Sequence, residues 1–267
     1  MKISLSVFMV LSFFCFSCVE TQQLTDKFPP PQLESTEAVE PPGQSSYWLS
    51  YPDNGDLVIW GVANRQGKRD DEIKLALDDA ARKVALFYGV KGKITTTTTN
   101  GSGLWAYSMD IATEFGYDTE YKKYIEALKY EENQDVLSID GALLLRVHYT
   151  LQNPLNVPFN SDVQGEKPEW IRKRPDIING YMAGVGFARP QGRFKETVSK
   201  AYEDAIISII KRISVKTSTR IITLGDGSTL VVEEEISEGE LQDFFVLEMW
   251  HDRATNGVHV LAVAKKK

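Results

Sequence analysis

Apolar residues recur at every third or fourth position in two separate stretches of the chain, which is the spacing of a helix that packs one face on a core. This spacing predicts helices over about 70–88 and 194–213. The two apolar stripes correspond position by position: Ile73, Ala76, Leu77, Ala80, Ala81, Val84, Ala85 and Tyr88 in the first, and Val198, Ala201, Tyr202, Ala205, Ile206, Ile209, Ile210 and Ile213 in the second. The alanines in each stripe would let the helix approach a sheet closely.

Extended segments surround the two predicted helices in the same order. Apolar runs at about 57–63 and 181–188 precede the helices, and the segments KITTTTTN and VKTSTRIITL, rich in β-branched residues, follow them. A polar stretch, expected to be partly helical, comes next in each half. The first half closes with GALLLRVHYTL, and the second with the hairpin FFVLEMW, HDRATNG, VHVLAVA. The pattern predicts an α+β fold in which a long helix packs on one face of an antiparallel sheet.

The order recurs because the two halves resemble each other in sequence. With an offset of 125 residues, 61–91 align with 186–216 without a gap, and nine of the 31 positions are identical. The identical pairs are Gly61/Gly186, Ala63/Ala188, Gln66/Gln191, Gly67/Gly192, Ala76/Ala201, Asp79/Asp204, Ala80/Ala205, Val90/Val215 and Lys91/Lys216. We interpret the chain as two tandem copies of a small α+β domain, repeat 1 over 46–152 and repeat 2 over 167–267, joined by a proline-containing linker, 153–166.

The repeat bears on the glycines of the second apolar run, Gly184 and Gly186. A strand, a glycine-rich turn and a helix N-terminus can cradle a phosphate. Only Gly186 has a counterpart in the first copy, however, and Arg189 stands where a dinucleotide loop needs its third glycine. Pro190 also removes a backbone amide that a phosphate would use. We therefore expect the shared glycine to permit close packing of strand and helix.

The N-terminus has the pattern of an export signal. Lys2 is followed by an apolar segment, Ile3 to Phe16, that is too short to span a bilayer comfortably, and then by Ser17 and Cys18. A small residue before a cysteine at this place resembles the lipobox of bacterial lipoproteins. The resemblance implies a signal peptide over 1–17 and lipidation, including palmitate, at Cys18. An ordinary cleaved signal and an uncleaved anchor are the alternatives. Residues 18–45 are polar and rich in proline, and we interpret them as a disordered tether.

Several of these features together resemble one family. They are the lipobox, the tether, PEW at 168–170, YMAGVGFA at 181–188, the alanine-containing helix and the closing EMWHD and VHVLAVAKK. The combination is similar to the Lpp-twenty type of bacterial outer-membrane lipoprotein, with the fuller match over about 168–265. That family includes small surface antigens and lipoproteins that build flagellar basal disks. The resemblance implies a cell-envelope location, and the tandem duplication departs from the usual single copy.

Composition and charge narrow the choice of partner and chemistry. The net charge of −7 makes nucleic acid an unfavourable partner. Both cysteines lie in the first 18 residues, so a mature chain beginning at Cys18 would have no internal disulfide and no thiol nucleophile. We find no catalytic motif and expect no cofactor and no enzymatic activity. The remaining candidates for a metal site are His251 and His259, which flank the final hairpin turn and could meet across it, with Glu248 nearby; the set lacks a clear third ligand.

A tyrosine-rich segment, YDTEYKKYIEALKY, offers a possible partner-binding surface. Tyr117, Tyr121 and Tyr124 would share one face if the segment were helical. Such a stripe is usually part of a core, and a groove for a glycan or a protein is the alternative.

These observations together predict a lipid-anchored envelope protein of the outer membrane with a structural or scaffolding role, which self-associates or binds an envelope partner. The alternative is a ligand-binding lipoprotein that holds a peptide or glycan between its two domains. The sequence leaves open whether the protein faces the periplasm or the cell surface.

Overall fold

The computed structural model describes residues 46–49, 55–101, 107–155, 157, 167–223 and 229–267. The predicted signal peptide, Cys18 and the tether lie outside these residues, as does most of the predicted linker. By its contacts the chain divides into residues 1–36 and residues 37–267, and all of the described residues belong to the second unit.

Helices α1 (Arg69–Tyr88) and α4 (Phe194–Ile213) form where the apolar spacing predicts them, to within one residue at each end. The strands are β1 Ser46–Leu49, β2 Leu57–Asn64, β3 Val90–Gly101, β4 Tyr107–Tyr117, β5 Leu128–Lys129, β6 Val136–Ile139, β7 Ala142–Tyr149, β8 Ile177–Ile178, β9 Tyr181–Ala188, β10 Val215–Thr223, β11 Thr229–Asp252 and β12 Gly257–Lys266. The short helical elements are η1 Tyr121–Ala127, α2 Glu132–Asp135 and α3 Glu169–Arg172.

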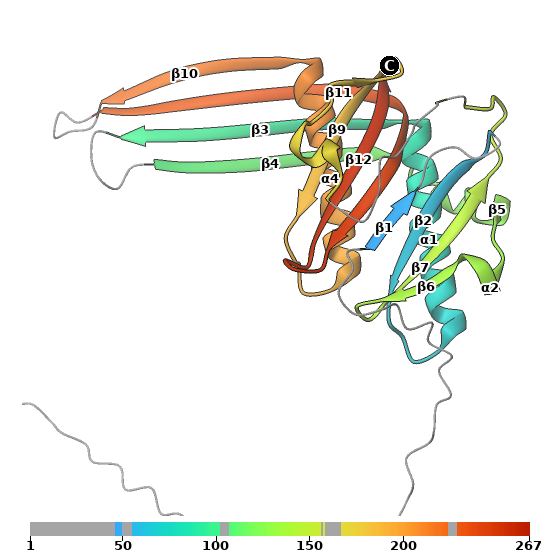
Figure 1. Ribbon diagram of the computed structural model, residues 1–267. Coiled ribbons are helices and arrows are strands. Elements are labelled where there is room, and N and C mark those ends of the chain that lie inside the picture. The colour runs from blue at the N-terminus through green and yellow to red at the C-terminus, as the bar shows by residue number, and fades with distance from the viewer. Residues whose placement is uncertain (1–45, 50–54, 102–106, 156, 158–166, 224–228) are drawn as a thin grey trace, which may run out of the picture. The chain divides into compact units, whose positions relative to one another are not determined.

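In the described residues the strands form two antiparallel sheets (Figure 1). The larger has eight strands in the order β4-β3-β11-β12-β9-β8, with β1 and β10 also paired to β11. The smaller has the order β2-β7-β5, with β6 also paired to β7. The predicted α+β class, with helices packed on antiparallel sheets, is confirmed. Strand β3 of the first half pairs directly with β11 of the second, so the two halves share one sheet.

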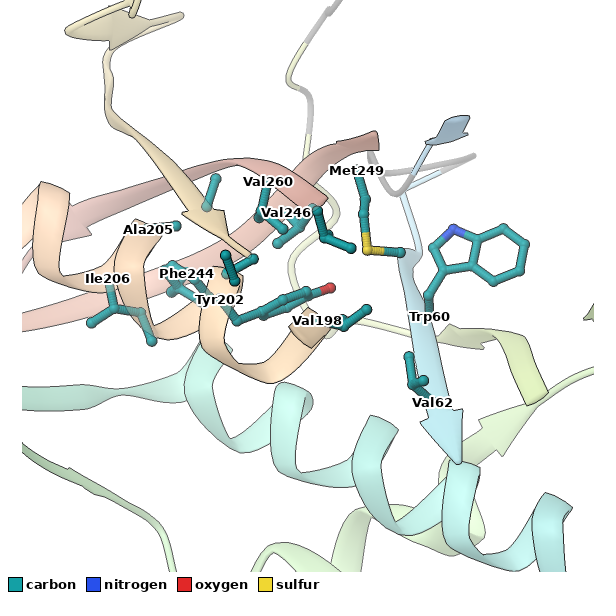
Figure 2. Close-up of a cluster of buried hydrophobic side chains, with 14 of the residues drawn as sticks. Trp60, Val62, Val198, Tyr202, Ala205, Ile206, Phe244, Val246, Met249 and Val260 are labelled. Atoms are coloured by element: carbon teal, nitrogen blue, oxygen red, sulfur yellow. The ribbon is translucent and has the colours of Figure 1, made fainter. Parts of the chain in front are cut away.

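The halves also share their hydrophobic cores. In one cluster, Trp60 and Val62 of β2 lie with the buried face of α4, including Val198 and Tyr202. Figure 2 shows these side chains together with Met249. In the other cluster, the alanine face of α1 lies with residues of β9, β11 and β12 from the second half. Neither half buries its apolar surface alone, and complete burial of each large aliphatic side chain contributes about 1.5–3 kcal/mol.

Each long helix lies directly against a glycine of its strand. A Cβ atom built on Gly61 would stand 2.1 Å from the carbonyl oxygen of Ala76, and one on Gly186 would stand 2.0 Å from that of Ala201. Ala80 lies against the first glycine and Ala205 against the second. The expectation that the shared glycine permits close packing is therefore confirmed. Gly186 faces a helix and not an open loop, which is a poor arrangement for a phosphate site.

Two further residues that are identical in the aligned halves make the same contacts in each half. Asp79 accepts a hydrogen bond from the backbone N–H of Val62 at 2.9 Å, and Asp204 accepts one from that of Phe187, also at 2.9 Å. The side-chain amides of Gln66 and Gln191 donate to the carbonyl oxygens of Asn64 and Arg189, at 3.1 and 3.0 Å. The contacts hold the end of the strand to the helix and fix the turn between them.

One predicted element is wrong. The polar stretch of the second half, expected to be partly helical, is part of the continuous strand β11, Thr229–Asp252. The strand forms because its backbone is paired on both sides, with β10 on one and β3 on the other. The run Glu233–Glu235 lies within this strand, and Glu233 is exposed, as expected of surface carboxylates.

Candidate interaction surface

Four strands extend the larger sheet beyond the helices. We define the ribbon as β4, β3, β10 and residues 229–240 of β11, in the order β4-β3-β11-β10. Figure 1 shows these strands running side by side away from α1 and α4. All neighbouring pairs are antiparallel, with an unbroken register over Val90–Gly101 of β3.

Both faces of the ribbon are accessible over most of its length. None of residues 95–100, 109–117, 215–223 or 229–236 is buried, and all nine residues of β10 are exposed. Ile94 and Ser237 are the first buried residues toward the helices. An antiparallel sheet normally packs one face on a core. A sheet that leaves both faces open presents a large surface for another molecule.

Large apolar side chains are exposed on the two outer strands of the ribbon, β4 and β10. Met109 and Ile111 of β4 are each 53% exposed, and Ile221 of β10 is 68% exposed. Val215 and Ile222 of β10 are also exposed. Exposed large apolar residues gathered on one element are typical of an interaction site.

The outer strands carry opposite charges. Lys216 and Arg220 are the charged residues of β10, and Asp110 and Glu114 are those of β4. Two lysines of the inner strand β3 pair with glutamates of β11, since Lys91 lies 3.7 Å from Glu240 and Lys93 lies 3.8 Å from Glu238. The opposite charges of the outer strands were not among the features predicted from the sequence. The signal that could have found them is the equal spacing of four residues, from Asp110 to Glu114 and from Lys216 to Arg220.

A cleft of about 220 Å³ lies between α1 and α4, at the C-terminal end of β4. Its lining includes Arg82 and Lys83 from α1, Tyr202 and Glu203 from α4, and Tyr117 from β4. Sites for drug-sized ligands usually measure about 300–1,000 Å³. This cleft has room for one small polar group or one side chain of a longer ligand.

Lys83, which lines this cleft, already contacts three other residues of the protein. Lys83 forms an ion pair with Asp79 at 2.8 Å, donates to the carbonyl oxygen of Trp60 at 2.6 Å and lies 4.5 Å from the ring centre of Tyr202. Burial would lower the pKa of Lys83, but Asp79 and Tyr202 outweigh it and raise that pKa. A charged lysine with these partners links α1 to α4 and is poorly suited to act as a base or nucleophile.

The three residues proposed for a metal site do not come together. His259 is the register partner of Trp250, whereas His251 opposes Val258, so the two imidazoles lie on opposite faces of the hairpin. The expectation that they meet across the turn is wrong, because the turn places them one residue out of register. Among the described residues no group of three metal-ligating side chains is found.

Each of these side chains has other contacts. His251 lies 3.0 Å from the amide oxygen of Asn256 and packs edge-on against Phe194, and burial lowers its pKa. His259 packs on Phe187 and Trp250, and burial, followed by the charge of Lys167, lowers its pKa to about 4. Glu248 is 1% exposed and accepts a hydrogen bond from the indole N–H of Trp170.

The three tyrosines do not form a helical stripe. Tyr117 ends β4, while Tyr121 and Tyr124 lie in the 3₁₀-helix η1, so the assumed helical spacing is wrong. Tyr124 stacks on Tyr88, and the hydroxyl of Tyr121 accepts from Arg82 at 3.0 Å. Tyr117 is 38% exposed and lines the cleft. Of the three, only Tyr117 lines the cleft and is also exposed.

Comparison with family models, curated proteins and solved structures gave no match to this chain. Among the residues that the structure describes, no helix is long and apolar enough to cross a membrane.

Proposed function

We propose that the protein is a lipid-anchored bacterial envelope protein that serves as a structural scaffold through self-association. The observation that carries this proposal is the ribbon, which leaves both faces of a four-stranded sheet accessible and exposes apolar residues on its outer strands. Anchoring through Cys18, a location at the outer membrane and membership of the Lpp-twenty type rest on the sequence motifs. A flagellar basal disk is one assembly that this resemblance implies. The role proposed is non-enzymatic.

The proposal includes the origin of the fold by tandem duplication. In its support, the contacts of Gly61 and Asp79 recur at Gly186 and Asp204, 125 residues further along the chain. The pairing of β2 with β7 also has a counterpart in that of β9 with β12. The large sheet, which joins β3 to β11, would then be an addition that turned two copies into one unit.

The cleft between α1 and α4 favours a second candidate, the binding of a peptide or glycan between the two halves. Arg82, Glu203 and Tyr117 offer it charge, hydrogen bonds and an aromatic surface. The small volume supports recognition of one group of such a ligand only.

Sedimentation velocity of the full chain in mild detergent, over a wide range of concentration, separates the two candidates. A scaffold is expected to grow in mass with concentration. A protein that stays monomeric and gains thermal stability from a muropeptide or a peptide library would be the ligand-binding lipoprotein.

A further inference from the structure

The ribbon ends in two strands with an unpaired edge. In the described residues β4 pairs only with β3, and β10 pairs only with β11. Each edge therefore presents a row of backbone N–H and C=O groups to solvent. Proteins normally protect such edges, because an open edge is a template for pairing with another strand.

The charges of the two edges favour pairing with each other and disfavour pairing with themselves. If β10 met a second β10 in antiparallel fashion, Lys216 could lie opposite Arg220. If β4 met a second β4, Asp110 could lie opposite Glu114. Like charges directly opposite are destabilising, whereas opposite charges stabilise a cross-strand pair. The complementary partner of β10 is thus the β4 of another copy.

The strand directions permit this pairing without any rotation of the second copy. Neighbouring strands alternate in direction across β4, β3, β11 and β10, so β4 and β10 run in opposite directions. A second copy placed beside the first in the same orientation brings its β4 antiparallel to β10. The four-stranded ribbon would then continue from copy to copy.

One register satisfies both charge pairs. Residues that face each other across an antiparallel pair have numbers with a constant sum. Lys216 opposite Glu114 gives the same sum as Arg220 opposite Asp110. The reason is that the two basic residues are four positions apart in β10 and the two acidic residues are four positions apart in β4. The ion pairs lie on one face of the sheet, since residues two and four apart share a face.

The same register matches the apolar residues on the other face. Ile221 falls opposite Met109, and Thr219 falls opposite Ile111. Three of these four are the exposed apolar residues already noted, and each would lose water contact when the edges join.

We propose that copies of this protein assemble edge to edge, with β10 of one copy paired antiparallel to β4 of the next in the register that joins Lys216 to Glu114 and Arg220 to Asp110. This inference deepens the proposed scaffold function and rests on it. The contact is heterologous, so it repeats and generates a closed ring or a helical filament. Backbone hydrogen bonds supply the attachment, and the charges select the partner edge and the register.

Charge reversal tests the choice of edges. The basic edge is reversed by Lys216→Glu with Arg220→Glu, and the acidic edge by Asp110→Lys with Glu114→Lys. Each variant alone has two edges of the same charge and is expected to self-associate about tenfold or more weakly than the wild type. A mixture of the two variants restores opposite charges at every junction and is expected to assemble again, as is the chain that carries all four substitutions.

Disulfide cross-linking tests the register. A full chain with Thr219→Cys and Ile111→Cys places two thiols opposite each other between copies, and mild oxidation is expected to give a ladder of multimers. The two strands are separated by two others within one copy, at about 4.8 Å per step, so an intramolecular bond is excluded. The control is Thr219→Cys with Ala112→Cys, which puts the thiols on opposite faces and should not exceed the background of the unsubstituted chain.

The outcomes distinguish this inference from the function on which it rests. If the wild type self-associates and either reversed variant does so equally well, the edge contact is wrong and the scaffold proposal survives. Failure of the mixed variants to assemble, or an equal ladder from the control pair, also overturns the edge contact. A wild-type chain that is monomeric at every concentration overturns both.

Discussion

Two glycines, Gly61 and Gly186, let the long helices lie directly against the sheets. In Gly186→Ala the new methyl group would stand 2.0 Å from the carbonyl oxygen of Ala201 and 2.4 Å from the backbone nitrogen of Ala205. Separations below 3.0 Å are essentially never found for a real Cβ, so α4 would have to retreat by at least about 1 Å. The obstructing atoms are backbone, which rotation of a side chain cannot move aside.

The loss of stability in Gly186→Ala has two contributions, overpacking of the core and a weakened hydrogen bond. Overpacking of a well-packed core costs about 1–3 kcal/mol. Movement of α4 also weakens the bond from Phe187 to Asp204, a net loss of about 1 kcal/mol. We therefore expect a total loss of about 2–4 kcal/mol of unfolding free energy. Gly61→Ala should lose a similar amount, because its methyl group would stand 2.1 Å from the carbonyl oxygen of Ala76.

Urea denaturation of the full chain measures this loss as a shift of the midpoint at an unchanged slope. The matched controls are Gly67→Ala and Gly116→Ala, where nothing lies within 4 Å of the added methyl group. Both controls should stay within about 0.5 kcal/mol of the wild type. A Gly186→Ala protein as stable as Gly67→Ala would refute the close helix–strand contact and, with it, the structural explanation for the shared glycine.

Three further predictions concern the anchor, a histidine and the buried ion pair. Cys18→Ser should move the protein from the membrane fraction to the soluble fraction, and a wild type that incorporates no labelled palmitate would contradict the lipid anchor. His259 has its pKa lowered from 6.5 to about 4 by burial, so the unfolded chain binds the proton first as the pH falls. Between pH 7 and pH 4.5 the wild type should therefore lose about 1–2 kcal/mol of unfolding free energy, a figure reduced for the partial exposure of His259. The variant His259→Phe should not show this loss, and an equal loss in the two proteins would refute the prediction. Asp79→Asn leaves Lys83 buried without its anion and should cost about 3 kcal/mol of unfolding free energy. The matched variant Asp204→Asn should cost about 1 kcal/mol. Equal melting temperatures for the two variants would show that the ion pair is unimportant.

The local patterns in the sequence predicted the helices and the strands next to them. Apolar residues at every third or fourth position predicted α1 and α4 to within one residue, and the identity of the two halves at Gly61 and Gly186 predicted the close packing found there. These predictions succeeded because they depend on neighbours close in sequence, whose spacing reports the face that a helix buries.

Two of the errors concern the pairing and register of strands. The polar run Glu233–Glu235 contains no strong strand signal of its own and is extended because β3 and β10 pair with it. The sequence does not reveal that partnership, so the ribbon could not be foreseen. The candidate site of His251 and His259 failed for a related reason, since the register of a hairpin depends on the geometry of its turn.

The proposed scaffold function requires that this protein builds part of the cell envelope. Electron cryotomography of cells lacking the protein, compared with cells that express the wild type from a plasmid, tests it most directly. We expect a periodic structure at the outer membrane, such as a ring or disk, that is absent from the deletion strain and returns with the wild type. Identical envelopes in the two strains, at matched expression and resolution, would contradict the scaffold function.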